Sequence, residues 1–196
     1  MKKFLASLIL IACFSQDSWS QDSLIRPRAI GVSFFFNDFL TARRIRSTSL
    51  SQVLSNDQWA KFREMAPGVA VTYFDGLTPH TDLAASIAFS FPTIDLPAKS
   101  NSTTDAMLIE VDASVNLKMF TDSYWFTPYI IAGVGASKYK GYYGAFIPLG
   151  GGIKVNFFDE ASLFITSQYR VPVTTETNNY HFMTSIGISG VIGGKK

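Results

Sequence analysis

Six charged side chains lie in or directly before segments of the sequence in which apolar residues alternate with polar ones. They are Asp82, Glu110, Asp112, Lys118, Lys154 and Arg170. A charge that leaves bulk water is costly unless an opposite charge or hydrogen bonds compensate it, so we expect ion pairs. If the segments run alternately up and down, Glu110 and Arg170 lie toward one end and Asp82 and Lys118 toward the other, with Asp112 and Lys154 between. The network would either fill a narrow interior or gate a pore, and filling is the preferred interpretation.

Residues for enzyme or metal chemistry are scarce. The histidines are His80 and His181, and His181 with Ser185 is the only pairing of a base with a hydroxyl that stands out. No Ser-His-acid spacing accompanies it, so we predict no catalytic residue and no enzyme. Cys13 is the only cysteine, and the residues at positions 150–152, all glycine, lie inside a predicted strand rather than a phosphate loop. No metal site and no cofactor are therefore predicted.

The elements that would position these side chains are strands. Apolar residues recur at every second position in eight segments, 30–37, 69–74, 83–91, 108–118, 126–136, 150–157, 162–171 and 182–188. The clearest is 108–118, in which Ile109 to Leu117 alternate with Glu110 to Lys118. That pattern predicts a strand with one apolar and one polar face.

The connections between these segments alternate in length. Longer ones at 40–66, 92–105, 138–145 and 172–179 alternate with shorter ones at 75–80, 119–124 and 158–160. All longer connections then fall at one end, as in an outer-membrane barrel with short periplasmic turns. The fold class we predict is all-β, an eight-stranded antiparallel up-and-down transmembrane β-barrel.

A soluble lipocalin-like barrel would alternate in the same way, so the chemistry of the two faces has to decide. The apolar faces carry no charged residue, whereas the opposite faces carry small residues, hydroxyls and the ionic groups. Aromatic residues gather near the strand ends, as in the girdles at the two membrane interfaces. They are Tyr73, Phe74, Phe120, Tyr124, Trp125 and Phe157 at the turn side, and Phe36, Phe39, Phe91, Tyr139, Tyr142, Tyr143, Tyr169 and Tyr180 at the loop side.

The first twenty residues have the layout of an export signal. Lys2 and Lys3 precede the apolar run 4–14, and small residues flank a cleavage point after Ser20. We predict a signal peptide at 1–20 and one barrel domain at 21–196. Residues 10–13, ending in Cys13, also resemble a lipobox, so lipoprotein processing at Cys13 stays an alternative. The 17 basic and 15 acidic residues nearly balance, which gives no indication of nucleic-acid binding.

Three stretches carry a family resemblance: residues 65–73, 128–136, and 142–151 with 155–160. On these motifs the chain resembles the N-terminal β-barrel of the outer-membrane protein A family, most closely the versions found in Bacteroidota. The resemblance implies export to the cell outer membrane. Many family members continue into a domain that grips peptidoglycan, but this sequence stops at Lys196, so no such domain is claimed. It also lacks the terminal aromatic residue common in barrel-only members, which leaves truncation open.

The first long connection is the other candidate site. It carries Arg43, Arg44 and Arg46, and Ser55 with Gln58 has the spacing of a capping box, which predicts a short amphipathic helix there. The arginines could bind phosphates of lipopolysaccharide, while a solvated loop is the simpler interpretation.

We therefore expect a non-enzymatic outer-membrane barrel with a role in envelope structure and surface contacts. Its partners would be outer-membrane lipid or lipopolysaccharide, and the barrel-assembly machinery during insertion. The alternatives are a small gated channel and a soluble periplasmic lipocalin-like binder. The sequence predicts neither a ligand nor an oligomeric state.

Overall fold

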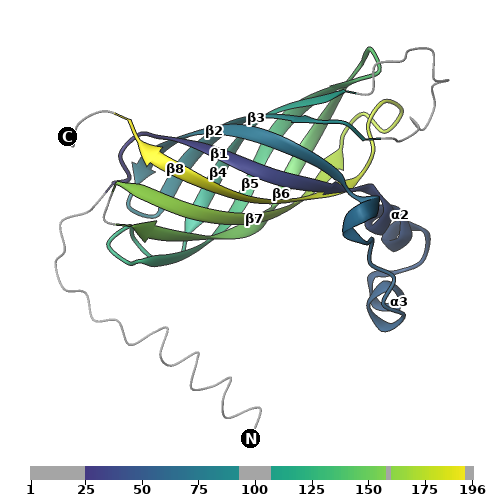
Figure 1. Cartoon of the computed structure of the whole chain (residues 1–196), viewed down its shortest axis with the longest axis horizontal. Coiled ribbons are helices and arrows are strands. Elements are labelled where there is room, and N and C mark those ends of the chain that lie inside the picture. The colour runs from purple at the N-terminus through teal and green to yellow at the C-terminus, as the bar shows by residue number, and fades with distance from the viewer. Residues whose placement is uncertain (1–24, 93–106, 158–159, 193–196) are drawn as a thin grey trace, which may run out of the picture.

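The described residues of the computed structural model, 25–92, 107–157 and 160–192, form a closed barrel of eight antiparallel strands in sequence order. The strands tilt strongly around the barrel, and the described chain enters and leaves at the same end (Figure 1). Because β8 pairs with β1, for example Val32 with Ile188, the barrel has no free edge. The strands are β1 (Ala29–Asp38), β2 (Ala66–Thr78), β3 (Thr81–Ser90), β4 (Leu108–Lys118), β5 (Phe126–Tyr139), β6 (Tyr142–Phe157), β7 (Ala161–Pro172) and β8 (His181–Val191).

Alternation of side chains decides which residues face outward. In β4 the predicted strand is confirmed residue for residue, with Val111, Val115 and Leu117 exposed and Glu110 and Asp112 buried. The same alternation runs through the other strands, so the outer face of the barrel is mainly apolar.

The fifth and sixth segments are longer than predicted, and the long connection expected at 138–145 is wrong. Strand β5 continues to Tyr139 and β6 begins at Tyr142, so only Lys140 and Gly141 join them. Both residues have positive φ, 48° and 81°. Two consecutive positive φ values are what a two-residue hairpin turn needs to match the twist of its strands.

The interior is less polar than expected. Four phenylalanines, Phe35, Phe74, Phe146 and Phe164, are buried on the inner face beside the polar groups. Phe35 lies against Gly68, where an added Cβ would stand 2.3 Å from the Phe35 Cζ. Glycine at position 68 therefore leaves the space that the Phe35 ring occupies. Phe74 and Tyr139 were expected in the aromatic girdles, but both are buried.

At one end, here called the loop end, residues 39–65 connect β1 to β2 and form short helices. Helix α2 (Phe39–Ser47) continues directly from β1, and Asp38 caps it by accepting a hydrogen bond from the Thr41 backbone N–H at 2.9 Å. Helix α3 (Leu50–Ser55) is capped by Ser49, and a 3₁₀ turn η1 (Phe62–Glu64) follows. The helix predicted from Ser55 and Gln58 is wrong, since Ser55 ends α3. Within the described ranges, no helix is long and apolar enough to cross a membrane.

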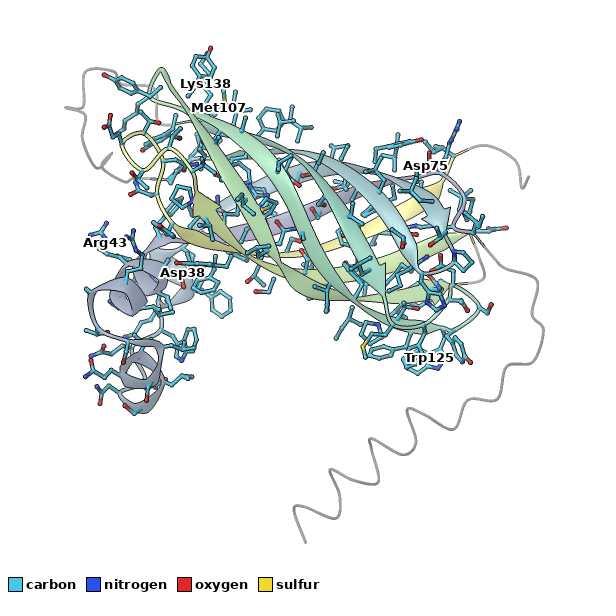
Figure 2. All side chains as sticks on the ribbon, turned by 180° about the vertical axis from the view of Figure 1, so that it is seen from behind. Asp38, Arg43, Asp75, Met107, Trp125 and Lys138 are labelled. Carbon is cyan, nitrogen blue, oxygen red and sulfur yellow. The ribbon has the colours of Figure 1, made fainter. Side chains whose placement is uncertain are left out.

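The opposite end, here called the turn end, carries the connections 79–80 and 119–125, the end of β6, the start of β7 and the described ends of the chain. Figure 2 labels residues at both ends: Arg43 and Lys138 lie at the loop end, and Asp75 and Trp125 at the turn end. The signal peptide expected at 1–20 and Cys13 lie outside the described residues.

Candidate functional site in the barrel interior

An ion-pair group near the loop end is built around Arg170 of β7. Its Nη1 lies 2.8 Å from Glu110 Oε2 and its Nη2 lies 3.0 Å from Asp112 Oδ2. The Nη2 contact is a hydrogen bond, whereas the Nη1 contact is close but not aligned as one. Ser86 donates to Asp112 at 2.6 Å, and the guanidinium also lies over the Phe146 ring. One cation thus compensates two carboxylates.

His181 completes this loop-end group. Its Nε2 lies 3.4 Å from Glu110 Oε1, and its Nδ1 lies 3.0 Å from the Asn179 carbonyl oxygen. The ring is 1% exposed and stacks at 4.5 Å on Phe39, the first residue of α2. His181 was not predicted as a partner of the ionic residues. Extending the inward alternation of Met183 and Ser185 one step back along β8 would have found it.

Phe39 closes the interior above the ion pairs. It is buried in a cluster with Leu108 of β4 and Tyr139 of β5, and Tyr142 packs against that cluster. The Tyr139 hydroxyl donates to the Pro92 carbonyl oxygen at 2.8 Å. Because these residues come from α2 and from strands β4 to β6, the cluster spans the loop end as an apolar lid.

A second ion-pair group lies near the turn end. The Lys118 Nζ is 2.7 Å from Asp82 Oδ1 and 2.7 Å from Asp122 Oδ2. Lys154 also pairs with Asp122 and lies 4.0 Å from Asp82. Arg26, which precedes β1, reaches in at 3.4 Å from Asp82 and donates to Ser189 at 3.0 Å. All five charged side chains are buried, and opposite charges alternate among them.

The turn residue Asp122 is held ionised by its neighbours. Burial raises the pKa of its carboxyl, but the ammonium groups of Lys154 and Lys118 outweigh that effect, and the net pKa lies below its ordinary value of 3.8. Asp122 therefore keeps its negative charge between two lysines, which would otherwise repel each other.

Little space remains between the side chains. A cavity of about 40 Å³ is lined in part by Asp112, Arg170 and Tyr129, and a space of about 10 Å³ lies beside Arg26 and Lys154. One water needs roughly 10 to 15 Å³ of such volume, so these spaces hold a few waters at most. A polar solute larger than a few waters has no room there.

The six residues predicted as an interior network all lie inside, but as two groups rather than one. Asp112, expected in the middle, pairs with Arg170, and Lys154 joins the turn-end group. Sequence reasoning missed Arg26 and Asp122 because neither is part of a strand, where alternation assigns a side.

The other candidate residues make different contacts from those considered. Ser185 hydrogen-bonds Thr166 at 2.5 Å rather than His181, and His80 lies in the β2–β3 turn beside the Lys118 carbonyl oxygen. No cluster of metal-ligating side chains occurs in the parts of the chain that the structure describes.

The three arginines of α2 differ from one another. Arg44 donates to the Gln58 carbonyl oxygen at 2.9 Å, and the Arg46 guanidinium lies 3.7 Å from the centre of the Tyr180 ring. Arg43 is exposed at the loop end, as Figure 2 shows. Arg44 and Arg46 therefore stabilise the position of α2, since each contacts a residue outside that helix.

Solved structures share this barrel. The N-terminal β-barrel domain of Pseudomonas aeruginosa OprF matches with a TM-score of 0.52 and 11% identity, over 83% of this chain and 96% of that chain. Neisserial surface protein A (NspA) matches with a TM-score of 0.52 and 11% identity, over 84% and 96%. No family model and no curated protein sequence matches the chain. What the chain has in common with these structures is its fold, that of the eight-stranded transmembrane β-barrels.

Proposed function

We propose that the protein is a non-enzymatic barrel of the bacterial outer membrane, with a structural role in the envelope and a loop end available for surface contacts. The observation that carries the proposal is the combination of an apolar outer face with a filled interior. A barrel surrounded by hydrocarbon has to turn its ionic side chains inward and pair them there.

The residues at the two ends of the apolar outer face support a bilayer environment. Among the described strand residues, the charged ones on the outward side of the alternation lie at the ends of the barrel (Figure 2). They are Asp75 at the turn end, and Lys138 and the buried α2 cap Asp38 at the loop end. Exposed aromatic residues stand near both limits, for example Trp125 at the turn end and Tyr143 at the loop end. A charge-free band bounded by aromatic residues is the pattern expected of a barrel in a bilayer core flanked by its two interfaces.

The orientation follows from the connections. Outer-membrane barrels place short turns in the periplasm and longer loops outside, so the loop end would face the exterior. The export signal predicted at 1–20 supplies the route, with the assembly machinery as the expected partner during insertion. Kinship with the outer-membrane protein A barrels of Bacteroidota remains a prediction.

The gated channel is less well supported than a closed barrel. The Phe39 lid and both ion-pair groups occupy the path that a solute would take. A lipocalin-like binder is also disfavoured, because such a barrel needs an apolar cavity for its ligand and a polar outer surface.

Membrane fractionation tests the proposal. We expect the full-length protein in the outer-membrane fraction, and we expect it to run faster on a gel when unheated than when boiled, because a closed barrel resists unfolding by detergent. Recovery in the soluble periplasmic fraction without detergent, with no shift on heating, would contradict the proposal.

A further inference from the structure

The connection between β1 and β2 carries an exposed aromatic and basic surface that the closed barrel does not use. Residues 59–63, here called the ledge, contain the exposed side chains of Trp59, Lys61, Phe62 and Arg63. Phe62 is 75% exposed, the largest exposed fraction among the large apolar side chains that the structure describes. An aromatic side chain so exposed between two cations suggests a partner that is apolar and anionic.

The ledge is continuous with the outward face of the barrel. The Phe62 ring packs edge-on against Phe36 at 5.7 Å between centroids, and Phe36 packs in the same way against Phe34 at 5.3 Å. Phe34 and Phe36 lie on the outward side of β1. An apolar row therefore runs from the face assigned to lipid directly onto the ledge.

The ledge is held in place by its own hydrogen bonds. The Ala60 backbone N–H donates to the Thr41 hydroxyl at 2.9 Å, which ties the ledge to α2. The Lys61 backbone N–H donates to the Glu64 carboxylate at 2.8 Å across the 3₁₀ turn. These bonds fix the backbone and leave the Lys61 and Arg63 side chains exposed.

The position of the connection matches a membrane surface. Figure 1 shows α2 and α3 at the loop end, with α3 projecting farther from the barrel than α2. In a barrel that spans a bilayer, a structure placed there would overlie the lipid headgroups around the barrel.

Charge agrees with that placement. The connection 39–65 contains the basic residues Arg43, Arg44, Arg46, Lys61 and Arg63 against the acidic Asp57 and Glu64. Its excess of positive charge favours a surface rich in phosphate.

We propose that the ledge binds the membrane surface, with Phe62 and Trp59 at the level of the headgroups and Lys61 and Arg63 on the phosphates of anionic outer-leaflet lipid. The ledge then lies on the membrane surface beside the barrel and orders lipid against the β1 side. This inference rests on the proposed membrane location, since it needs a bilayer around the barrel.

Tryptophan quenching tests the ledge directly. The full chain has three tryptophans, so the variant W19F/W125F leaves Trp59 alone, and W19F/W59F leaves Trp125 alone. Each is reconstituted in phosphatidylcholine vesicles with and without phosphatidylglycerol, using lipids brominated on the acyl chain near the headgroup. We expect Trp59 to be quenched, and more strongly in the anionic vesicles.

Two further changes in the Trp59-only protein separate the apolar from the ionic contribution. F62S should lower the quenching of Trp59 about twofold in both kinds of vesicle, while K61Q/R63Q should remove the difference between them. The controls are V173S, an exposed apolar residue of the β7–β8 connection, and K138Q/K140Q, two cations of the β5–β6 hairpin. Both controls should leave Trp59 quenching unchanged.

The two tryptophans distinguish the possible failures. If Trp125 is quenched and the protein shows its heat-modifiable migration, but Trp59 is not quenched, the ledge inference is wrong and the barrel proposal stands. If neither tryptophan is quenched and migration is not heat-modifiable, the barrel proposal itself fails. Equal quenching of Trp59 in the K61Q/R63Q variant and its parent in both kinds of vesicle would overturn the assignment to anionic headgroups.

Discussion

Arg170 is the side chain on which the loop-end group depends, because its single guanidinium compensates both Glu110 and Asp112. Replacing it with methionine keeps much of the volume and leaves two buried carboxylates without a cation. We expect R170M to lower the free energy of unfolding by about 3 to 5 kcal/mol. Urea titration in detergent micelles, followed by the unheated gel band, measures this change.

The matched control is Arg28, whose ion pair with Asp75 is largely exposed, at 3.5 Å and with 60% of the Arg28 side chain accessible. R28M should cost less than about 1 kcal/mol. Equal stability of R170M and the wild-type protein would mean that the buried pairs do not hold the interior together.

Asp122 supports a prediction about pH. Its pKa is lowered in the folded state, so its contribution is fully present above the unfolded value of 3.8 and is lost as the pH falls through the lower folded value. Near pH 7, D122N should be less stable than wild type by about 3 kcal/mol, since Lys118 and Lys154 lose their shared anion, and the difference should shrink as the pH falls below 3.8.

Urea unfolding midpoints from pH 7 to below pH 3.8 would check the Asp122 prediction, with D75N as the control for a half-buried carboxylate. A difference between D122N and wild type that grows as the pH falls would contradict the assigned sign.

At the scale of elements, the contact between β1 and β2 depends on a glycine. A valine at position 68 would push against Phe35 and against the Phe89 carbonyl oxygen, which an added Cβ would approach to 2.5 Å. We expect G68V to cost about 1 to 3 kcal/mol in the same unfolding assay.

Two comparison variants define the cause of the G68V effect. Gly190 has no atom within 4 Å of an added Cβ, so G190V should have a much smaller effect. Shortening the ring in G68V/F35L should restore part of the lost stability. Loss of stability that F35L does not relieve would point to a cause other than the ring.

The strands could be predicted because apolar residues recur at every second position along them. In β4 even the ends were right, since Leu108 and Lys118 close a regular pattern. The β5–β6 turn was missed because Lys138 and Lys140 are of a residue type common in exposed loops. The positive φ of Lys140 could not be predicted, because lysine has no preference for that backbone conformation. The helix was misplaced because Ser49 and Ser55 both have capping chemistry, and packing of Val53 and Ala60 decides between them.

At the scale of the molecule, the side of most strand residues could be predicted, with Phe74 and Tyr139 as exceptions, whereas the partner of each residue could not. Alternation places Glu110 and Arg170 inside, but which carboxylate meets which cation depends on the closure of the barrel and on Arg26 and Asp122, which lie outside the strands. The lid could not be predicted for the same reason. Phe39 lies after the end of β1, where alternation assigns no side, and it was expected in the aromatic girdle.

The closed interior is the central claim, and single-channel recording in planar lipid bilayers tests it most directly. Protein whose insertion is verified by heat-modifiable migration should give no conductance steps above the bare membrane, either as wild type or as R170A, since the Phe39 lid and the turn-end group remain in both. Discrete steps from the wild-type protein would contradict the account and restore the gated channel.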